Sequence, residues 1–272
     1  MSQRLENALK IKGPGLITYL MAGDPDPDTT LRRLLGLAQS GVNVLELGVP
    51  FSDPIADGPV IQAAGLRALE SFMDLKKVLK LVHAFRRQNQ DTPLLLMSYL
   101  NPLLSYGYER FLKDAVQTGV DGLILPDLPW RESRPFRQKA QETVKNQLVF
   151  IPMIAQTSLP EHIQSLTELK DGFVYVLSRN GITGGQAEIP PHILNYIQNL
   201  KENLTLPRYV GFGIQAPEQV AKLSEVCEGV VVGSALVKKF AQIDALNLPE
   251  DEKVEREQEV YQWITSLRGN SV

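Results

Sequence analysis

The sequence predicts an α/β protein of the (β/α)8, or TIM barrel, class with extra helices. Short apolar runs alternate with segments of helical periodicity, and 272 residues with 43% hydrophobic content suffice for a barrel of this class. Such alternation makes parallel βα units, and eight units favour a closed barrel over the alternative, an open doubly wound sheet. The candidate strands are Leu16–Leu20, Val42–Leu47, Leu94–Met97, Gly122–Leu125, Val149–Met153, Phe173–Leu177, Tyr209–Gly211 and Gly229–Val232.

Helical segments separate these strands. Leu31, Leu34 and Leu35 recur at the spacing of one helix face. The interval between the second and third strands is long enough for an additional helix, and the apolar pattern over residues 254–267 predicts a terminal helix packed on the outside. No linker or low-complexity tract divides the chain, so we expect one barrel domain over residues 1–272.

The composition excludes several classes of partner. The 28 basic and 31 acidic residues give a formal net charge of −3 without long like-charge blocks, which gives no electrostatic case for nucleic acid or membrane binding. Cys227 is the only cysteine, and the N-terminus lacks a signal-peptide core, so we expect a cytoplasmic protein. His83, His162 and His192 lie outside any metal-ligand spacing, so no metal is expected.

The second strand carries a carboxylate among apolar neighbours. Glu46 interrupts the run Val42–Leu47, which is typical of a strand buried on both faces. Burial removes hydration from an ionised carboxylate, so the pKa of Glu46 should rise until the group holds a proton near neutral pH. A structural pairing of Glu46 with a buried Arg or a backbone donor is the alternative.

A second carboxylate follows in a stiff loop. Asp57 lies between Pro54 and Pro59, which restrict φ, and next to Gly58, which permits an unusual turn. Two carboxylates in unlike surroundings suggest two roles in acid/base chemistry. Alternatively, Asp57 caps a turn or the helix that begins near Val60.

Further polar and glycine residues follow other strands, at the barrel end where chemistry gathers. Tyr99 and Asp127 follow the third and fourth strands. Three glycine-rich turns follow the last three strands, and their backbone N–H groups favour a phosphate site. These turns are Arg179-Asn180-Gly181-Ile182-Thr183-Gly184-Gly185, Gly211-Phe212-Gly213-Ile214 and Gly233-Ser234-Ala235.

Over nearly the whole chain, the sequence resembles the tryptophan synthase alpha subunit family. The matching segment from Glu46 to Gln62 carries the resemblance furthest, and its part from Glu46 to Pro59 is highly specific. The other matching segments are Ala22-Gly23-Asp24-Pro25, Leu123-Ile124-Leu125-Pro126-Asp127-Leu128-Pro129, Ser178-Arg179-Asn180-Gly181-Ile182-Thr183-Gly184 and Gly211-Phe212-Gly213-Ile214.

The resemblance implies a lyase that cleaves indole-3-glycerol phosphate into indole and glyceraldehyde 3-phosphate in L-tryptophan biosynthesis. It assigns Glu46 as the acid/base group at indole C3 and the substrate hydroxyl, and Asp57 as the group that stabilises the indole nitrogen as it becomes cationic and takes its proton. It also implies an αββα heterotetramer, in which the beta subunit consumes indole at its own pyridoxal phosphate site. The chain itself is expected to need no cofactor.

The resemblance assigns other residues to substrate binding. It assigns phosphate binding to Gly184, Gly213, Gly233 and Ser234. It assigns the lining of the indole pocket to Tyr19, Tyr99, Tyr175, Leu177 and Phe212, and the aromatic side chains among them suit an indole ring. The loops Pro50–Gly58 and Arg179–Pro190 are expected to close over substrate, with Thr183 contacting Asp57.

The sequence departs from the family pattern at two positions near the first strand's end. Met21 stands where the family usually has Thr, and Tyr19 replaces a more usual Phe. The first change removes a hydroxyl, so the positioning of Asp57 is expected to differ and catalysis to be slower. The second adds a hydroxyl at the indole pocket and is expected to affect fit more than chemical roles.

Three other functions stay open at this point. The chain could act mainly as a regulatory subunit, as a stand-alone lyase that releases indole, or as another phosphate-sugar barrel enzyme. The retained Glu46 and Asp57 argue against the first. No Lys ends a strand run, which disfavours a Schiff-base aldolase.

Overall fold

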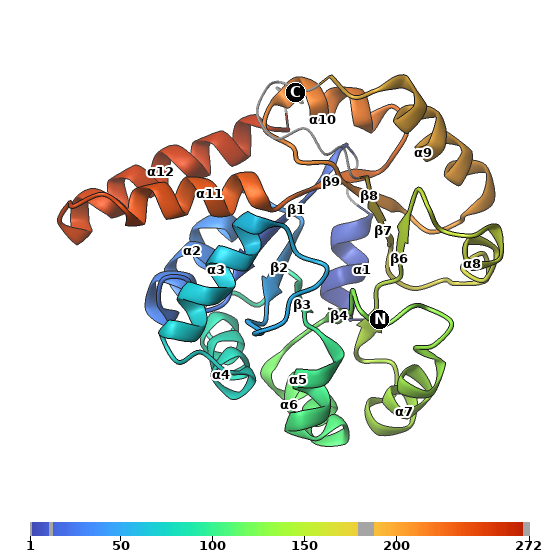
Figure 1. The fold of residues 1–272 in the computed structure, drawn as a ribbon, viewed down its shortest axis with the longest axis horizontal. Coiled ribbons are helices and arrows are strands. Elements are labelled where there is room, and N and C mark those ends of the chain that lie inside the picture. The colour runs from blue at the N-terminus through green and yellow to red at the C-terminus, as the bar shows by residue number, and fades with distance from the viewer. Residues whose placement is uncertain (1, 11–12, 179–187, 269–272) are drawn as a thin grey trace.

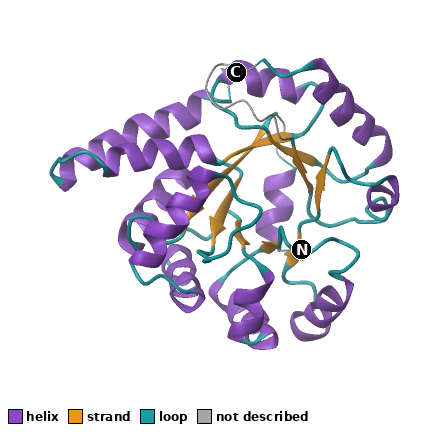
Figure 2. Ribbon diagram, in the orientation of Figure 1, coloured by secondary structure: helices purple, strands orange, loops and turns teal. Residues whose placement is uncertain are grey.

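A ring of parallel strands surrounded by helices makes up the protein (Figure 1). The computed structural model describes residues 2–10, 13–178 and 188–268. The strand order is β5-β4-β3-β2-β1-β9-β8-β7-β6, and all neighbours pair in parallel. The strands form the inner wall and the helices the outer layer (Figure 2).

The fifth barrel strand is divided in two, which explains why the order has nine members. β5 (Val149–Phe150) pairs with β4, and β6 (Met153–Ala155) pairs with β7. The residues between them keep both contacts, because Ile151 N–H donates to the Leu123 carbonyl and the Pro152 carbonyl accepts from Tyr175 N–H, each at 2.9 Å. One segment therefore joins both ends of the sheet, and the open doubly wound alternative is wrong.

The remaining strands match the sequence prediction to within a few residues. They are β1 (Gly15–Met21), β2 (Val44–Gly48), β3 (Leu94–Met97), β4 (Gly122–Ile124), β7 (Val174–Leu177), β8 (Arg208–Gly211) and β9 (Gly229–Val232). The start of β2 lies later than predicted, and the Asn43 side chain accepts a hydrogen bond from Leu16 N–H at 2.8 Å just before it.

The predicted outer helices are confirmed. Two helices, α3 and α4, fill the long interval between β2 and β3, and α12 is the predicted terminal helix. None of the described helices is long and apolar enough to span a membrane. The outer helices are α2 (Pro27–Gln39), α3 (Pro59–Glu70), α4 (Leu75–Arg86), α5 (Leu100–Tyr106), α6 (Tyr108–Thr118), α7 (Arg134–Val144), α8 (Pro160–Gln164), α9 (Pro191–Asn203), α10 (Pro217–Ser224), α11 (Ser234–Asp244) and α12 (Glu250–Ser266).

A short N-terminal helix that the sequence analysis did not predict lies inside the ring of strands (Figure 1). This helix is α1 (Gln3–Leu9), and its N-cap Ser2 accepts from Leu5 N–H at 3.2 Å. Leu5 and Ala8 are buried in the cluster that fills the barrel interior. The interior cluster consists of Leu5, Ala8, Ile17, Val44, Leu95, Ile124, Val149, Ile151, Phe173, Tyr209 and Val231.

Replacing Leu5 by Ala should lower the free energy of unfolding by about 2–5 kcal/mol, because it opens a cavity where α1 fills the barrel. Leu246→Ala is the control, since Leu246 is 42% exposed and should cost about 0.5 kcal/mol or less. Urea unfolding measures both. Equal, small effects would show that α1 contributes little to the core.

Candidate active site

The side chains of Tyr19 and Glu46 point into the barrel near its C-terminal end. Ile17 of β1 and Val44 of β2 are register partners in the interior cluster. Alternate residues of a strand share a face, so Tyr19 and Glu46, also register partners, point inward two residues further along. The carboxylate therefore lies inside the barrel, at the end where barrel enzymes carry their sites.

Glu46 is a buried carboxyl group without a structural partner. It is 1% exposed, and neither carboxyl oxygen has a hydrogen-bond partner among the described residues. Burial, followed by the nearby charge of Asp57, raises the pKa of Glu46 to about 8. The group thus holds a proton at neutral pH, as the sequence predicts, and the alternative of a pairing with a buried Arg is wrong for the described structure.

Asp57 lies in a different environment. It is half-buried in the loop after β2, and burial raises its pKa to about 6, an effect opposed by a hydrogen bond from Tyr99. The N-cap of α3 is Gly58 and makes no side-chain capping bond, so Asp57 does not cap this helix. Its place just before a helix N-terminus also favours the charged form. At pH 7 the site therefore combines a protonated and an ionised carboxyl group.

Tyr99 fixes the loop that carries Asp57. Its hydroxyl accepts a hydrogen bond from Ala56 N–H at 3.0 Å, and its ring packs against Phe51 with centroids 5.3 Å apart. Burial first, and then the charge of Asp57, raise the pKa of Tyr99 to about 12. The family resemblance assigns Tyr99 to the wall of the indole pocket, and nothing in the sequence indicates its contact with Ala56.

Two further tyrosines face the carboxyl groups. Tyr19 and Tyr175 have pKa values raised well above the ordinary value, by burial first and then by the charges of Asp57 and Glu46. Both hydroxyl groups therefore stay protonated and can donate hydrogen bonds. The Tyr19 hydroxyl contacts Met21 Sδ at 3.9 Å, so the two departures from the family pattern lie against each other.

Gly48 makes room for the Tyr19 hydroxyl. A Cβ atom at position 48 would overlap that hydroxyl group and its ring. This requirement of Gly48 was not predicted from the sequence. The combination of Tyr19 with a glycine two positions after Glu46 is the signal that could have shown it.

The other predicted binding residues follow the late strands. Leu177 ends β7 and is 37% exposed, whereas Phe212 after β8 is 8% exposed. Gly213 has φ +80°, which favours glycine, and Gly233 and Ser234 form the N-cap and first residue of α11. Thr183, Gly184 and most of the Arg179–Pro190 loop lie outside the described residues.

Asp127 has a structural contact. Both of its carboxylate oxygens accept from Leu100 N–H, at 3.0 and 3.1 Å, at the start of α5. Within the described ranges, the His, Cys, Asp and Glu side chains form no group of three that could hold a metal ion.

Closed barrels with acid and base groups at the C-terminal ends of their strands are (β/α)-barrel enzymes. Comparison with known proteins gives the family. The family model described as tryptophan synthase alpha chain matches residues 5–267. The chain belongs to the tryptophan synthase alpha chain family, which makes it a lyase with the alpha-subunit role in tryptophan biosynthesis.

Relatives and solved structures agree. The tryptophan synthase alpha chain of Geobacillus kaustophilus is 41% identical over 96% of this chain and 95% of its own length. The tryptophan synthase alpha chain of Halalkalibacterium halodurans is 43% identical over 91% of this chain and 92% of its own length. The crystal structure of tryptophan synthase subunit alpha from Legionella pneumophila str. Paris matches with a TM-score of 0.86, 34% identity and 98% coverage of both chains.

A further structural match concerns an assembly. It is a Pyrococcus furiosus structure described as the structural basis of mutual activation of the tryptophan synthase a2b2 complex. Its TM-score is 0.81 at 34% identity, and the match covers 94% of this chain and 98% of that chain.

Glu46→Gln should change how stability depends on pH. The pKa of Glu46 rises from 4.5 to about 8 on folding. Between these values the folded protein keeps a proton that the unfolded chain releases, so the wild-type free energy of unfolding falls as pH rises through this window. Gln cannot titrate. The stability of the variant relative to wild type should therefore increase from pH 4.5 to 8 and level off above; parallel pH profiles in urea unfolding would contradict the buried, protonated Glu46.

Proposed function

We propose that this chain cleaves indole-3-glycerol phosphate to indole and glyceraldehyde 3-phosphate, as a carbon–carbon lyase acting by retro-aldol chemistry. The observation that carries the proposal is the pair of carboxyl groups in opposite protonation states, Glu46 with a pKa of about 8 and Asp57 with a pKa of about 6. Family membership names the enzyme, and this pair supplies the acid and the anion that the reaction requires.

The proton transfers balance with these two groups. Protonated Glu46 gives its proton to indole C3, and the ring nitrogen becomes cationic beside ionised Asp57. The Glu46 carboxylate then takes the proton of the side-chain hydroxyl, the carbon–carbon bond breaks, and its electron pair restores the aromatic ring. Glu46 ends protonated as it began, so the cycle needs no cofactor in this chain.

The surrounding residues suit the two halves of this substrate. Tyr19, Tyr99 and Tyr175 supply aromatic surface for the indole, with Leu177 and Phe212 as further walls. The backbone N–H groups at Gly213, Gly233 and Ser234 are placed after β8 and at the N-terminus of α11, where a phosphate is favoured. Gly184 and Thr183 complete the proposed set by family resemblance.

We further propose that the C-terminal face of the barrel binds a beta subunit in an αββα complex. Three exposed apolar side chains follow strand ends on this face: Ile55 at 81%, Leu104 at 49% and Leu159 at 67% exposed. A contiguous apolar surface marks a protein interface, so these three side chains are the candidates for its contacts. The partner would receive indole at its own pyridoxal phosphate site. A biosynthetic enzyme with a single cysteine suits the reducing cytoplasm.

Glu46→Gln and Asp57→Asn should each lower the rate of cleavage by at least about a hundredfold, because each removes a proton transfer or a charge without changing the side chain's shape. Substrate affinity should stay within several-fold. Steady-state indole formation and calorimetry measure the two quantities. Near-normal turnover of either variant, under conditions in which chemistry limits the rate, would make its catalytic assignment wrong.

Leu104→Ser should weaken binding to a matching beta subunit by about tenfold, because it removes an apolar contact from the proposed interface. Cleavage by the isolated chain should be unchanged. Leu246→Ser is the control, because Leu246 is 42% exposed and Leu104 is 49% exposed. This variant should bind the beta subunit normally. Equal binding by both variants would place the interface elsewhere.

Addition of beta subunit to the wild-type chain should increase the rate of cleavage. The increase should be about tenfold if the beta subunit favours the closed loops by ~1.4 kcal/mol.

A further inference from the structure

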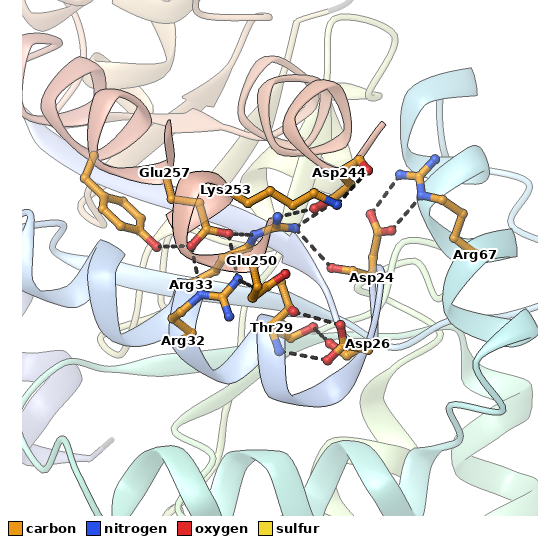
Figure 3. Close-up of polar contacts among 12 residues, drawn as sticks. Asp24, Asp26, Thr29, Arg32, Arg33, Arg67, Asp244, Glu250, Lys253 and Glu257 are labelled. Atoms are coloured by element: carbon orange, nitrogen blue, oxygen red, sulfur yellow. Dashed lines mark hydrogen bonds and ion pairs between the residues drawn. The ribbon is translucent and has the colours of Figure 1, made fainter. Parts of the chain in front are cut away.

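A cluster of ion pairs links residues of the outer helices α2, α3, α11 and α12 (Figure 3). At its centre is Arg33 of α2, whose side chain is 2% exposed. Its guanidinium pairs with Asp244 at the end of α11 at 2.5 Å and with Glu257 of α12 at 2.7 Å. Arg33 Nη1 also donates to the backbone carbonyl of Asp24 at 3.5 Å.

The same Asp24 holds a second helix. Its carboxylate, 8% exposed, accepts two parallel hydrogen bonds from Arg67 of α3, at 2.7 and 2.8 Å. Such a two-pronged pair fixes orientation as well as distance. The backbone around Asp24 is itself anchored, because Gly23 N–H donates to Thr30 Oγ1 at 3.0 Å and the Gly23 carbonyl accepts from Ser71 Oγ at 3.1 Å.

The two helices that meet at this cluster carry the two halves of the proposed site. α3 and α11 pack against each other and against β1 (Figure 1). The N-terminus of α3 follows Asp57 directly, and the N-terminus of α11 is Ser234. Arg67 lies in the last turn of α3, and Asp244 is the last residue of α11.

We infer that the Asp24–Arg67 and Arg33–Asp244 pairs set the spacing between Asp57 and the phosphate end of the site. Arg67 and Asp24 are positioning residues. Arg67 lies in the last turn of α3, at the opposite end of that helix from Asp57, and Asp24 holds it from the loop after β1. The cluster fixes the C-terminal end of α3 to the loop after β1 and the C-terminal end of α11 to α2, which follows that loop, so the N-termini of α3 and α11 keep a fixed spacing. This inference rests on the proposed function, because it gives Asp57 and Ser234 the two ends of one substrate.

The test compares ligands that need the spacing with ligands that do not. The three probes are indole, glycerol phosphate, and an uncleavable analogue in which a saturated three-carbon chain links indole to phosphate. Arg67→Met should weaken binding of the linked analogue about tenfold and lower the cleavage rate, because a misplaced pair of subsites no longer matches a fixed linker. The two separate fragments should bind within about twofold of wild type. Calorimetry measures all three affinities.

Two further variants and one control sharpen the result. Arg67→Lys, which keeps the charge but not the parallel bonds, should give an intermediate loss. The double variant Asp24→Asn with Arg67→Met should be no worse than the more damaged single variant, since the two residues act as one unit. Lys139→Met breaks a 2.7 Å ion pair with Glu109 between α6 and α7, away from α3 and α11, and should leave every affinity unchanged.

The outcomes are distinguishable. Equal weakening of all three ligands by Arg67→Met would show general loosening and would overturn the inference. Behaviour indistinguishable from Lys139→Met would overturn it too, while leaving the lyase proposal intact. If the wild-type chain neither forms indole nor binds the linked analogue, the proposed function fails, and the inference falls with it.

Discussion

The burial of one carboxyl group inside the barrel is the constraint on which the rest of the site depends. Glu46 has no hydrogen-bond partner among the described residues, so its neutral form is the one the fold favours. This state persists only while the strands around it exclude water. Three features exclude water from Glu46. They are the closure of the barrel through the divided fifth strand, the interior cluster, and the rings of Tyr19 and Tyr175.

The two ends of the barrel divide stability from chemistry. At the N-terminal end, the fully buried carboxylate of Asp121 accepts bonds from Arg4 of α1, Arg86 of α4 and the backbone N–H of Leu94. Both carboxylate oxygens of Asp121 have partners, which ties α1, α4 and β3 together. At the C-terminal end, Glu46 has no hydrogen-bond partner within residues 2–10, 13–178 and 188–268, and this group is available for chemistry.

Local patterns in the sequence predicted the strands and the first carboxylate. The β-branched and apolar runs identified each barrel strand, and a single Glu within one run was enough to predict a raised pKa. The division of the fifth strand also has a local cause, because Pro152 has no N–H to donate. The division was not predicted, because the apolar run Val149–Met153 is continuous in the sequence.

Features that depend on distant partners were not predicted. Arg33 and Glu257 are 224 positions apart, and nothing near either residue indicates the other. The place of α1 inside the barrel likewise depends on the space that eight strands leave, which no seven-residue segment specifies. The fit of Tyr19 over Gly48 depends on strand register, and the proposed contact of Thr183 with Asp57 lies outside the described residues.

The pairing of the first strand with the last has a consequence for synthesis on the ribosome. β1 pairs with β2 on one side and with β9 on the other, so one of its edges has no partner until β9 has been made. At about 5–20 residues per second, that edge waits roughly ten seconds or more after β1 emerges. An unpaired parallel edge can associate with other chains. The nascent chain is therefore most exposed to aggregation in the interval before its last strand leaves the ribosome, whatever the stability of the finished barrel.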